Sequence, residues 1–492
     1  MRFLKVIIGL AIGSGPAPAL AQQDAAAHWR ELTATDVEAA YRILLEDHPG
    51  AAPEAGNEAF RKRLAAGYET ARTRAAQVTS YDGYVATLAG LAVGMGDKHI
   101  WSRPLYVPDR PEWPGVILAR RGRDFVVLDE SDAAQGAPLK GAKLVSCDGV
   151  PADRLADERL GGFRVVRGIE AQLIQRSAWL LVEEGNPFLK RPQSCDFSQD
   201  GKARTVPLKW RSLWRHDYFA RLGSMPTRGA AGFGVRKVGE GYWIAVQSFG
   251  ERAVPVVEEV RAKVAELRAA PYVVLDLRGN GGGNSLFGRQ IAQALLGDRY
   301  VDSVAGGEGG EDDCGKAWRV SERNIKQVAY YKDEMGPRMG AEAAAGFKAE
   351  YDILAAAKAA GQPFTGKPRC APAGAKSGKK KPRVKPDYAG RVILLTDNAC
   401  FSSCLMVTDE FRRLGALHVG QETDANTHYM EVREDKLPSG LSMFSTLQAM
   451  MPGSPLQMGP FTPTMLFGGN IADTAALEAW VASLAASPPP RS

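Results

Sequence analysis

Two apolar strand-like segments, each running directly into a loop of small residues and then a helix, constrain the fold of this chain most. Residues 272–277 and 391–396 have the continuous apolar character of buried strands, and helical periodicity follows each of them. The order strand, helix, strand implies a parallel sheet. In an open parallel sheet the loops that follow the strands lie on one edge, so we expect residues 278–284 and 397–404 to approach each other.

The rest of the chain divides by composition and periodicity. Its 492 residues are enough for several domains, and 45% apolar with 24% charged residues exclude a disordered or collagen-like protein. We predict a helical N-terminal domain, a small β-rich domain and an α/β core, at residues 22–103, 104–213 and 214–492, with an insertion in the core at about 303–388. The basic run 376–385 in the insertion lacks interleaved aromatic residues and is broken by proline, which favours a solvated loop over a nucleic-acid site.

The N-terminus has the character of a secretory signal. Residues 1–21 combine a basic start, a short apolar run and the small-residue site Ala19-Leu20-Ala21. The run 4–12 is far shorter than the roughly 20 apolar residues of a membrane span, and no later stretch is apolar enough to be one. We therefore expect a secreted or periplasmic protein with no integral membrane segment after signal cleavage. The net charge of +6 is too small to argue for nucleic acid as a partner.

The first loop of interest, residues 276–284, reads Asp-Leu-Arg-Gly-Asn-Gly-Gly-Gly-Asn. Closely spaced glycines between a strand and a helix let the backbone approach a ligand and present free amides. The third glycine of a dinucleotide-binding fingerprint is absent, and so is a phosphate-loop Gly-Lys-Ser/Thr. Two interpretations stay open: an anion-stabilising turn, or a tight crossover in which the glycines serve only the backbone.

The second loop places Ser402 and Ser403 at the start of a helix. A serine there exposes its side chain at a helix N-terminus, and the amide of the next residue points at any oxyanion that its attack would form. The competing interpretation is that one of these serines is merely the N-cap of the helix. A nucleophilic serine needs a base, and His99 and His428 are both candidates because each lies in a polar, turn-rich segment, whereas His418 lies in a strand-like run.

Three segments together resemble one family: residues 94–99 (Gly-Met-Gly-Asp-Lys-His), residues 274–283, and residues 400–403 (Cys-Phe-Ser-Ser) followed by 419–423. The chain resembles the C-terminal processing (tail-specific) serine peptidases and the related tricorn core proteases. Residues 141–149 also resemble a turn of the PDZ-like domain that these proteases usually carry. The resemblance implies an α/β, crotonase/ClpP-like core with a PDZ-like β-rich domain and an N-terminal helical domain.

The resemblance also implies site residues. Ser402 corresponds to the nucleophile because it follows Phe401 where family members have Phe-Ser-Ala-Ala-Glu. The amide of Ser403, with one from Gly281 or Gly282, would form the oxyanion hole. His99 matches the histidine of the tricorn-like Asp-Gly-His-Thr motif and becomes the preferred base, with His428 as the alternative.

Two departures from the family pattern matter for the chemistry. The processing proteases use a Ser-Lys pair, but residues 420–426, where that lysine would fall, contain none. The acidic residue that often follows the nucleophile is replaced by Cys404 and Leu405. We therefore expect a Ser-His site in which a carboxylate, Glu422 or Asp424, orients the imidazole.

These observations predict an exported serine peptidase that hydrolyses peptides or unfolded proteins through an acyl-enzyme on Ser402. The alternative is a catalytically inactive relative that binds peptide tails or small apolar ligands. We expect no cofactor and no metal, because the cysteines have neither the spacing nor the histidine partners of a zinc site.

The chain has six cysteines, which in an oxidising compartment are candidates for disulfides. Cys400 and Cys404 bracket Ser402, and a disulfide between them would pin the nucleophile turn. Proximity in sequence further favours Cys147 with Cys195 and Cys314 with Cys370.

Overall fold

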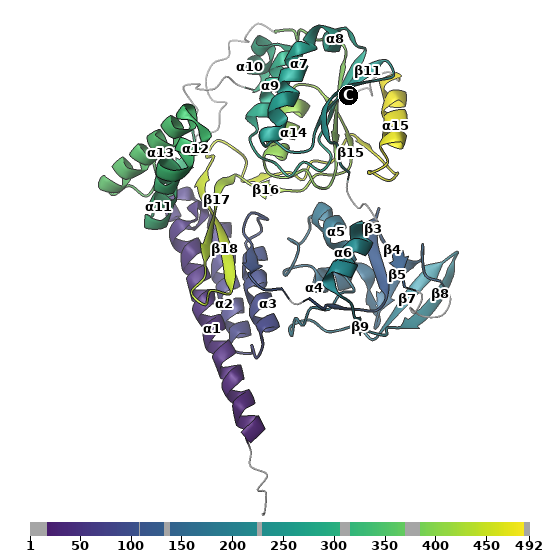
Figure 1. Ribbon diagram of the computed structural model, residues 1–492, viewed down its shortest axis with the longest axis vertical. Coiled ribbons are helices and arrows are strands. Elements are labelled where there is room, and N and C mark those ends of the chain that lie inside the picture. Colours follow the sequence, from purple (N-terminus) through teal and green to yellow (C-terminus); the bar gives the residue numbers. More distant parts are fainter. Residues whose placement is uncertain are drawn as a thin grey trace, which may run out of the picture.

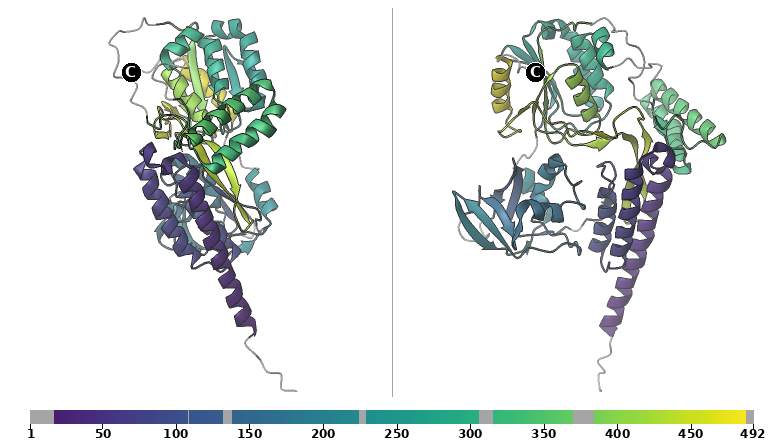
Figure 2. Two further views of the ribbon diagram at one scale, coloured as in Figure 1. Left: turned by 90° about the vertical axis from the view of Figure 1, so that its left-hand side faces the viewer. Right: turned by 180° about the vertical axis from the view of Figure 1, so that it is seen from behind.

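The computed structural model describes residues 17–107, 109–131, 138–223, 229–305, 315–369 and 384–486, without the side chains of residues 17–23 and 305. Most of the predicted signal segment lies outside this part of the chain. Within the described residues, no helix is long and apolar enough to cross a membrane. Figures 1 and 2 show an α/β core, a β-rich unit and a group of helices beside a long β-hairpin.

A six-stranded sheet forms the α/β core. Its strand order is β10-β11-β12-β14-β15-β20, and all neighbours are parallel except the antiparallel pair β10 and β11. The strands are β10 (Phe233–Val238), β11 (Gly241–Val246), β12 (Tyr272–Asp276), β14 (Arg391–Thr396), β15 (Leu417–Gly420) and β20 (Met465–Leu466). The helices of the core are α7 (Val254–Ala262), α8 (Val264–Ala269), α9 (Leu286–Leu296), α10 (Asp298–Ala305), α14 (Ser403–Arg413) and α15 (Thr474–Ala486).

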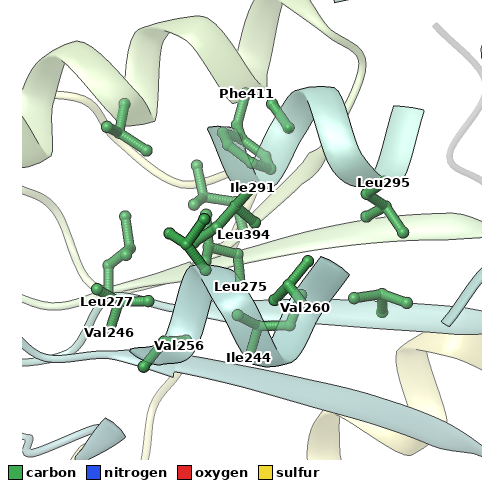
Figure 3. Close-up of a cluster of buried hydrophobic side chains, with 14 of the residues drawn as sticks. Ile244, Val246, Val256, Val260, Leu275, Leu277, Ile291, Leu295, Leu394 and Phe411 are labelled. Atoms are coloured by element: carbon green, nitrogen blue, oxygen red, sulfur yellow. The ribbon is translucent and has the colours of Figure 1, made fainter. Parts of the chain in front are cut away.

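Helices cover both faces of this sheet, which explains why its central strands are continuously apolar. Alternate side chains such as Leu275 and Leu394 pack with Ile291 of α9 and Phe411 of α14 (Figure 3). The side chains between them face the other way and pack against α15, as the buried Val274 does. The two loops after β12 and β14 therefore emerge side by side at the carboxyl edge of the sheet.

The β-rich unit is a separate sheet of order β3-β4-β5-β7-β8, with β6 paired to β5. Its strands are β3 (Val116–Arg121), β4 (Asp124–Glu130), β5 (Lys143–Cys147), β6 (Val150–Pro151), β7 (Ser194–Gln199) and β8 (Lys202–Pro207). Beside them lie α4 (Ala152–Arg159), α5 (Glu170–Arg176), α6 (Arg215–Gly223) and the short pair β2 (Glu112–Trp113) and β9 (Arg211–Ser212). The disulfide Cys147–Cys195 joins β5 to β7.

The helical unit is completed by strands from far along the chain. Helices α1 (Ala17–Asp47), α2 (Glu58–Ala75) and α3 (Tyr81–Val93) share an apolar core with the hairpin of β17 (Tyr429–Lys436) and β18 (Ser442–Met450). Strand β1 (Ser102–Pro104), which follows α3, pairs with β18. The N-terminal helices are thereby tied directly to the segment that follows β15.

The insertion forms a small group of helices packed on the hairpin. It contains β13 (Ala317–Trp318), α11 (Glu322–Tyr330), a π-helix (Tyr331–Met335), α12 (Gly336–Met339) and α13 (Ala341–Ala359). Trp318, Val328 and Leu354 share a buried cluster with Ala449 of β18. Residues 306–314 and 370–383, which hold most of the basic run, lie outside the described residues.

The predicted fold class is confirmed: a mainly parallel α/β core accompanied by N-terminal helices and a β-rich unit. Two predicted disulfides, Cys147–Cys195 and Cys400–Cys404, are present. The third predicted pair, Cys314 with Cys370, lies outside the described residues.

Candidate active site

Ser402 lies at the sharp turn between β14 and α14. Its backbone has φ 58° and ψ −127°, a left-handed conformation that costs a residue with a side chain about 1–3 kcal/mol. Although Ser402 occupies the N-cap position of α14, its side chain makes no capping hydrogen bond. The neighbouring Ser403 hydroxyl donates to the Gly283 carbonyl instead, at 2.5 Å. Of the two serines, Ser402 is thus the one whose hydroxyl is left for chemistry.

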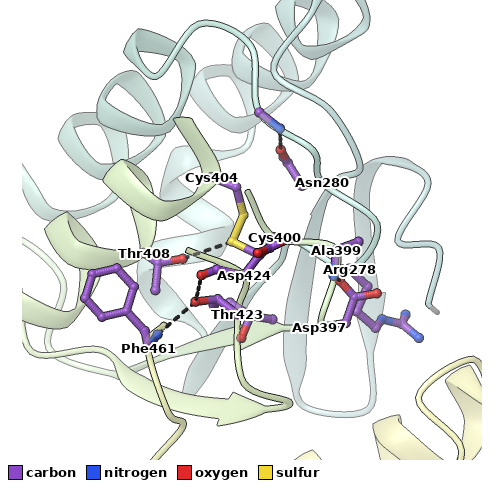
Figure 4. Close-up of a disulfide and its surroundings, with 12 residues drawn as sticks. Arg278, Asn280, Asp397, Ala399, Cys400, Cys404, Thr408, Thr423, Asp424 and Phe461 are labelled. Atoms are coloured by element: carbon purple, nitrogen blue, oxygen red, sulfur yellow. Dashed lines mark hydrogen bonds between the residues drawn. A yellow bond between two sulfur atoms is a disulfide. The ribbon is translucent and has the colours of Figure 1, made fainter. Parts of the chain in front are cut away.

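The loop that carries Ser402 is fixed from both sides (Figure 4). The Cys400–Cys404 disulfide spans it, with both residues fully buried. Before it, the buried Asp397 carboxylate accepts the amides of Gly279 at 3.0 Å, Ala399 at 3.0 Å and Gly229 at 2.9 Å. Burial raises the pKa of Asp397 to about 6, even though these three amides favour its charged form. This one carboxylate connects the serine loop to the glycine-rich turn.

The glycine-rich turn lies against Ser402. A Cβ on Gly282 would lie 2.8 Å from the Cβ of Ser402, and Gly282 has φ +108°, so only glycine fits this position. The fully buried Asn280 organises the turn: its carbonyl accepts the Phe401 amide at 3.2 Å, and its Oδ1 accepts the Gly282 amide at 2.8 Å.

These bonds decide which amides remain for an oxyanion. The Gly282 amide is occupied by Asn280, which removes Gly282 from the predicted set of donors. No acceptor among the described residues takes the amide of Gly281 or that of Ser403. The Ser403 amide is also the first of α14, where the helix dipole favours negative charge.

His99 stands beside this loop and is held by Asp97. The His99 ring packs against the ring of Phe401, with the two centroids 4.4 Å apart. Phe401 immediately precedes Ser402 in the chain. Its Nδ1 lies 2.8 Å from Oδ1 of Asp97. A carboxylate only accepts, so Nδ1 carries the proton and Nε2 is the basic nitrogen. Among the described residues, no hydrogen bond joins the Ser402 hydroxyl to this imidazole.

Asp97 is fully engaged as an acceptor. Its Oδ1 also accepts the His99 amide at 2.8 Å, and its Oδ2 accepts the Thr427 amide at 3.0 Å and the Thr427 hydroxyl. Burial alone would raise the pKa of this carboxyl, but the His99 imidazole and the hydrogen bonds from His99 and Thr427 hold the pKa of Asp97 well below its usual range. The charged Asp97 can therefore orient His99 and stabilise its protonated form.

The other predicted site residues lie elsewhere. Glu422 bonds the Thr462 hydroxyl at 2.7 Å rather than a histidine, and Asp424 pairs with Lys98 at 2.7 Å. Neither carboxylate orients His99, which corrects the predicted assignment. His428 is buried, its Nδ1 lies 3.3 Å from the Ser454 carbonyl, and burial lowers its pKa.

No group of three or more His, Cys, Asp or Glu side chains in the described part of the chain could hold a metal ion. The chemistry that the arrangement supports is proton transfer from a serine hydroxyl to a carboxylate-held imidazole, beside two free amides.

Residues 241–454 match the model of peptidase family S41. The chain carries a peptidase family S41 domain. The predicted serine peptidase is thereby confirmed at the level of the family, while histidine rather than lysine as the base stays a prediction.

Solved structures share the fold over nearly the whole chain. Mature CPAF matches with a TM-score of 0.56 at 14% identity, over 93% of this chain and 98% of that one. Mature CPAF complexed with lactacystin matches with a TM-score of 0.55 at 13% identity, over 93% of this chain and 99% of that one. At such identities the likeness shows a common fold alone. No curated protein sequence matches the chain.

No role was predicted from the sequence for Asp97 or for Asp397. Asp97 stands two residues before His99, and that spacing was the available signal, because a short Asp-x-His turn can bring the carboxylate back to its own histidine. Asp397 gave no signal, because its three partners come from three separate segments.

Proposed function

We propose that this protein is an exported serine peptidase that hydrolyses peptide bonds of peptides or unfolded proteins through an acyl-enzyme on Ser402. The observation that carries the proposal is the Asp97-His99 pair, packed on Phe401 beside a serine with left-handed backbone and an uncommitted hydroxyl. Export rests on the signal-like residues 1–21 and on the two disulfides, which are typical of oxidising compartments.

In the acylation step, Nε2 of His99 takes the proton of the Ser402 hydroxyl while Oγ forms a bond to the carbonyl carbon of the substrate. The resulting oxyanion accepts the amides of Ser403 and Gly281. Asp97 stabilises the imidazolium. The C–N bond then breaks, and the imidazolium gives its proton to the leaving amine.

In the deacylation step, His99 takes a proton from water, whose oxygen attacks the ester carbon. The Oγ–C bond breaks and the proton returns to Ser402. Both steps balance with water as the one co-reactant, so no cofactor is required.

A fluorophosphonate probe tests this proposal because it forms an adduct only with an activated serine. We expect the wild type to be labelled, Ser402→Ala to be unlabelled, and Ser403→Ala to be labelled still, since the Ser403 hydroxyl is bonded to Gly283. A wild type without any adduct would overturn the proposal and would favour a non-catalytic relative that binds peptide tails or small apolar ligands.

A further inference from the structure

We propose that Asp424 is a positioning residue. Through Lys98 it holds the loop of the base, His99, against the loop of the nucleophile, Ser402. Two glutamines of α5, in the β-rich unit, also donate hydrogen bonds to Asp424. This inference rests on the proposed function and adds to it residues that do not touch the reacting atoms.

Asp424 is a completely buried carboxylate at the junction of four segments. Its Oδ2 accepts Nζ of Lys98 at 2.7 Å, and its Oδ1 accepts Nε2 of Gln172 at 2.8 Å and the Ala425 amide at 2.8 Å. Its own amide donates to the carbonyl of Cys400 in the nucleophile loop at 3.0 Å. A buried carboxylate is tolerated when it is paired and fully hydrogen-bonded, and Asp424 meets both conditions.

Lys98 transmits this anchoring to the site. It stands between Asp97 and His99 in the chain, and its ammonium group lies 4.7 Å from the centre of the Phe401 ring. The His99 ring packs on the same Phe401 ring. Phe401 thus touches both the base and the lysine beside it. The Lys98–Asp424 ion pair fixes one side of this arrangement, and the hydrogen bonds that Thr427 donates to Asp97 fix the other.

The β-rich unit supplies the remaining donors. Gln175 of α5 accepts a hydrogen bond from Lys98 at 3.0 Å, and its amide nitrogen bonds both the Asn398 carbonyl and Asp424. Gln172 is held in turn by the Val166 amide, which donates to its Oε1 at 2.8 Å. Two side chains one helical turn apart on α5 therefore touch the base loop, the nucleophile loop and Asp424 at once.

This arrangement depends on one ion pair, between Lys98 and Asp424, and not on apolar packing alone. Removing the charge of Asp424 leaves the Lys98 ammonium without its carboxylate, and removing the ammonium leaves a buried, unpaired carboxylate. Either change frees the loop of His99 on the Lys98 side, while the hydrogen bonds that His99 and Thr427 make to Asp97 remain. The rate of the chemical step should then fall more than the affinity for a probe.

Saturation kinetics with a fluorophosphonate test this on the full chain, giving the maximal inactivation rate and the half-saturating concentration separately. We expect Asp424→Asn and Lys98→Met each to lower the maximal rate by about 10–100-fold, with less than about threefold change in half-saturation. The double variant should lose no more than either single one, because both remove the same ion pair. Lys98→Arg, which keeps the pair, should retain the rate within about fivefold.

Matched controls are Glu422→Gln, which removes a partly exposed carboxylate two residues from Asp424, and Lys62→Met, which removes an exposed ion pair with Glu58. Both should label like the wild type. Where Asp424→Asn fails to fold by circular dichroism, Gln172→Ala with Gln175→Ala takes its place, with an expected loss of about 3–10-fold.

Single variants within twofold of the wild-type maximal rate, or losses that multiply in the double variant, would overturn this inference while leaving the proposed function standing. A wild type that is not labelled would overturn both.

Discussion

Replacing Asp97 with asparagine changes the charge and the donor pattern of one buried side chain without changing its size. In the native site both carboxylate oxygens accept: Oδ1 takes two N–H groups of His99, and Oδ2 takes the amide and hydroxyl of Thr427. An asparagine has one acceptor oxygen and one NH₂ group, so either orientation turns a donor against a backbone amide.

The two orientations have different chemical consequences. With NH₂ toward His99, Nδ1 must become the acceptor, and Nε2 then carries a proton and cannot serve as a base. With NH₂ toward Thr427, the backbone amide of Thr427 loses its acceptor and the imidazolium loses its negative partner. Hydrogen bonds to a charged group contribute about 1.5–3 kcal/mol each, and one or two are lost, so we expect a transition-state cost of about 1.5–6 kcal/mol. This corresponds to roughly a 10–10⁴-fold slower reaction.

The assay is the second-order rate constant for fluorophosphonate labelling at pH 7.5, with mass spectrometry confirming the adduct on Ser402. Glu422→Gln is the control, because Glu422 was one of the two carboxylates predicted from the sequence and it bonds Thr462 instead. Labelling of Asp97→Asn within threefold of the wild type, or a large loss in Glu422→Gln, would refute this reasoning.

Three further outcomes are expected. Gly282→Ala places a methyl group 2.8 Å from the Cβ of Ser402 and should slow labelling by at least about 100-fold, whereas Gly281→Ala, with open space around its Cβ, should label nearly as well as the wild type; equal rates would contradict the packing described. Asp397 has a pKa of about 6 in the fold against an ordinary value of 3.8, so its contribution to stability is lost as pH rises from about 4 through 6. Asp397→Asn removes this titration and should gain about 3 kcal/mol in unfolding free energy relative to the wild type between pH 4 and pH 7.5 in denaturant titrations; a constant difference would contradict it. Replacing both cysteines of Cys147–Cys195 with alanine should cost about 4 kcal/mol of stability with labelling preserved, while the same change at Cys400–Cys404 should cost about 2 kcal/mol and slow labelling; the reverse pattern would contradict these roles.

The core of this fold could be predicted because its strands and helices leave a hydrophobic pattern within short stretches of sequence. The apolar strands β12 and β14 and the loops after them follow from continuous hydrophobicity and from the edge that parallel strands share. Ser402 followed from its place at a strand-to-helix turn and from the family resemblance. The disulfides Cys147–Cys195 and Cys400–Cys404 followed from proximity in the chain.

The parts that escaped prediction depend on contacts between distant segments. The helical unit takes its hairpin from residues 429–450, more than 300 residues after α3. Asp424 was predicted as a candidate to orient a histidine, but Lys98 reaches it across 326 residues of chain and forms an ion pair with it. Glu422 was the other candidate carboxylate, but its side chain accepts a hydrogen bond from the Thr462 hydroxyl.

The central claim is that His99, and no other histidine, activates Ser402. The most direct measurement compares the labelling rate of Ser402 in His99→Ala and in His428→Ala, each checked for native circular dichroism. We predict that the labelling rate falls at least about 1,000-fold in His99→Ala and less than about tenfold in His428→Ala. The smaller effect is expected because the His428 ring faces the Ser454 carbonyl. Retained labelling in His99→Ala together with lost labelling in a folded His428→Ala would contradict the account.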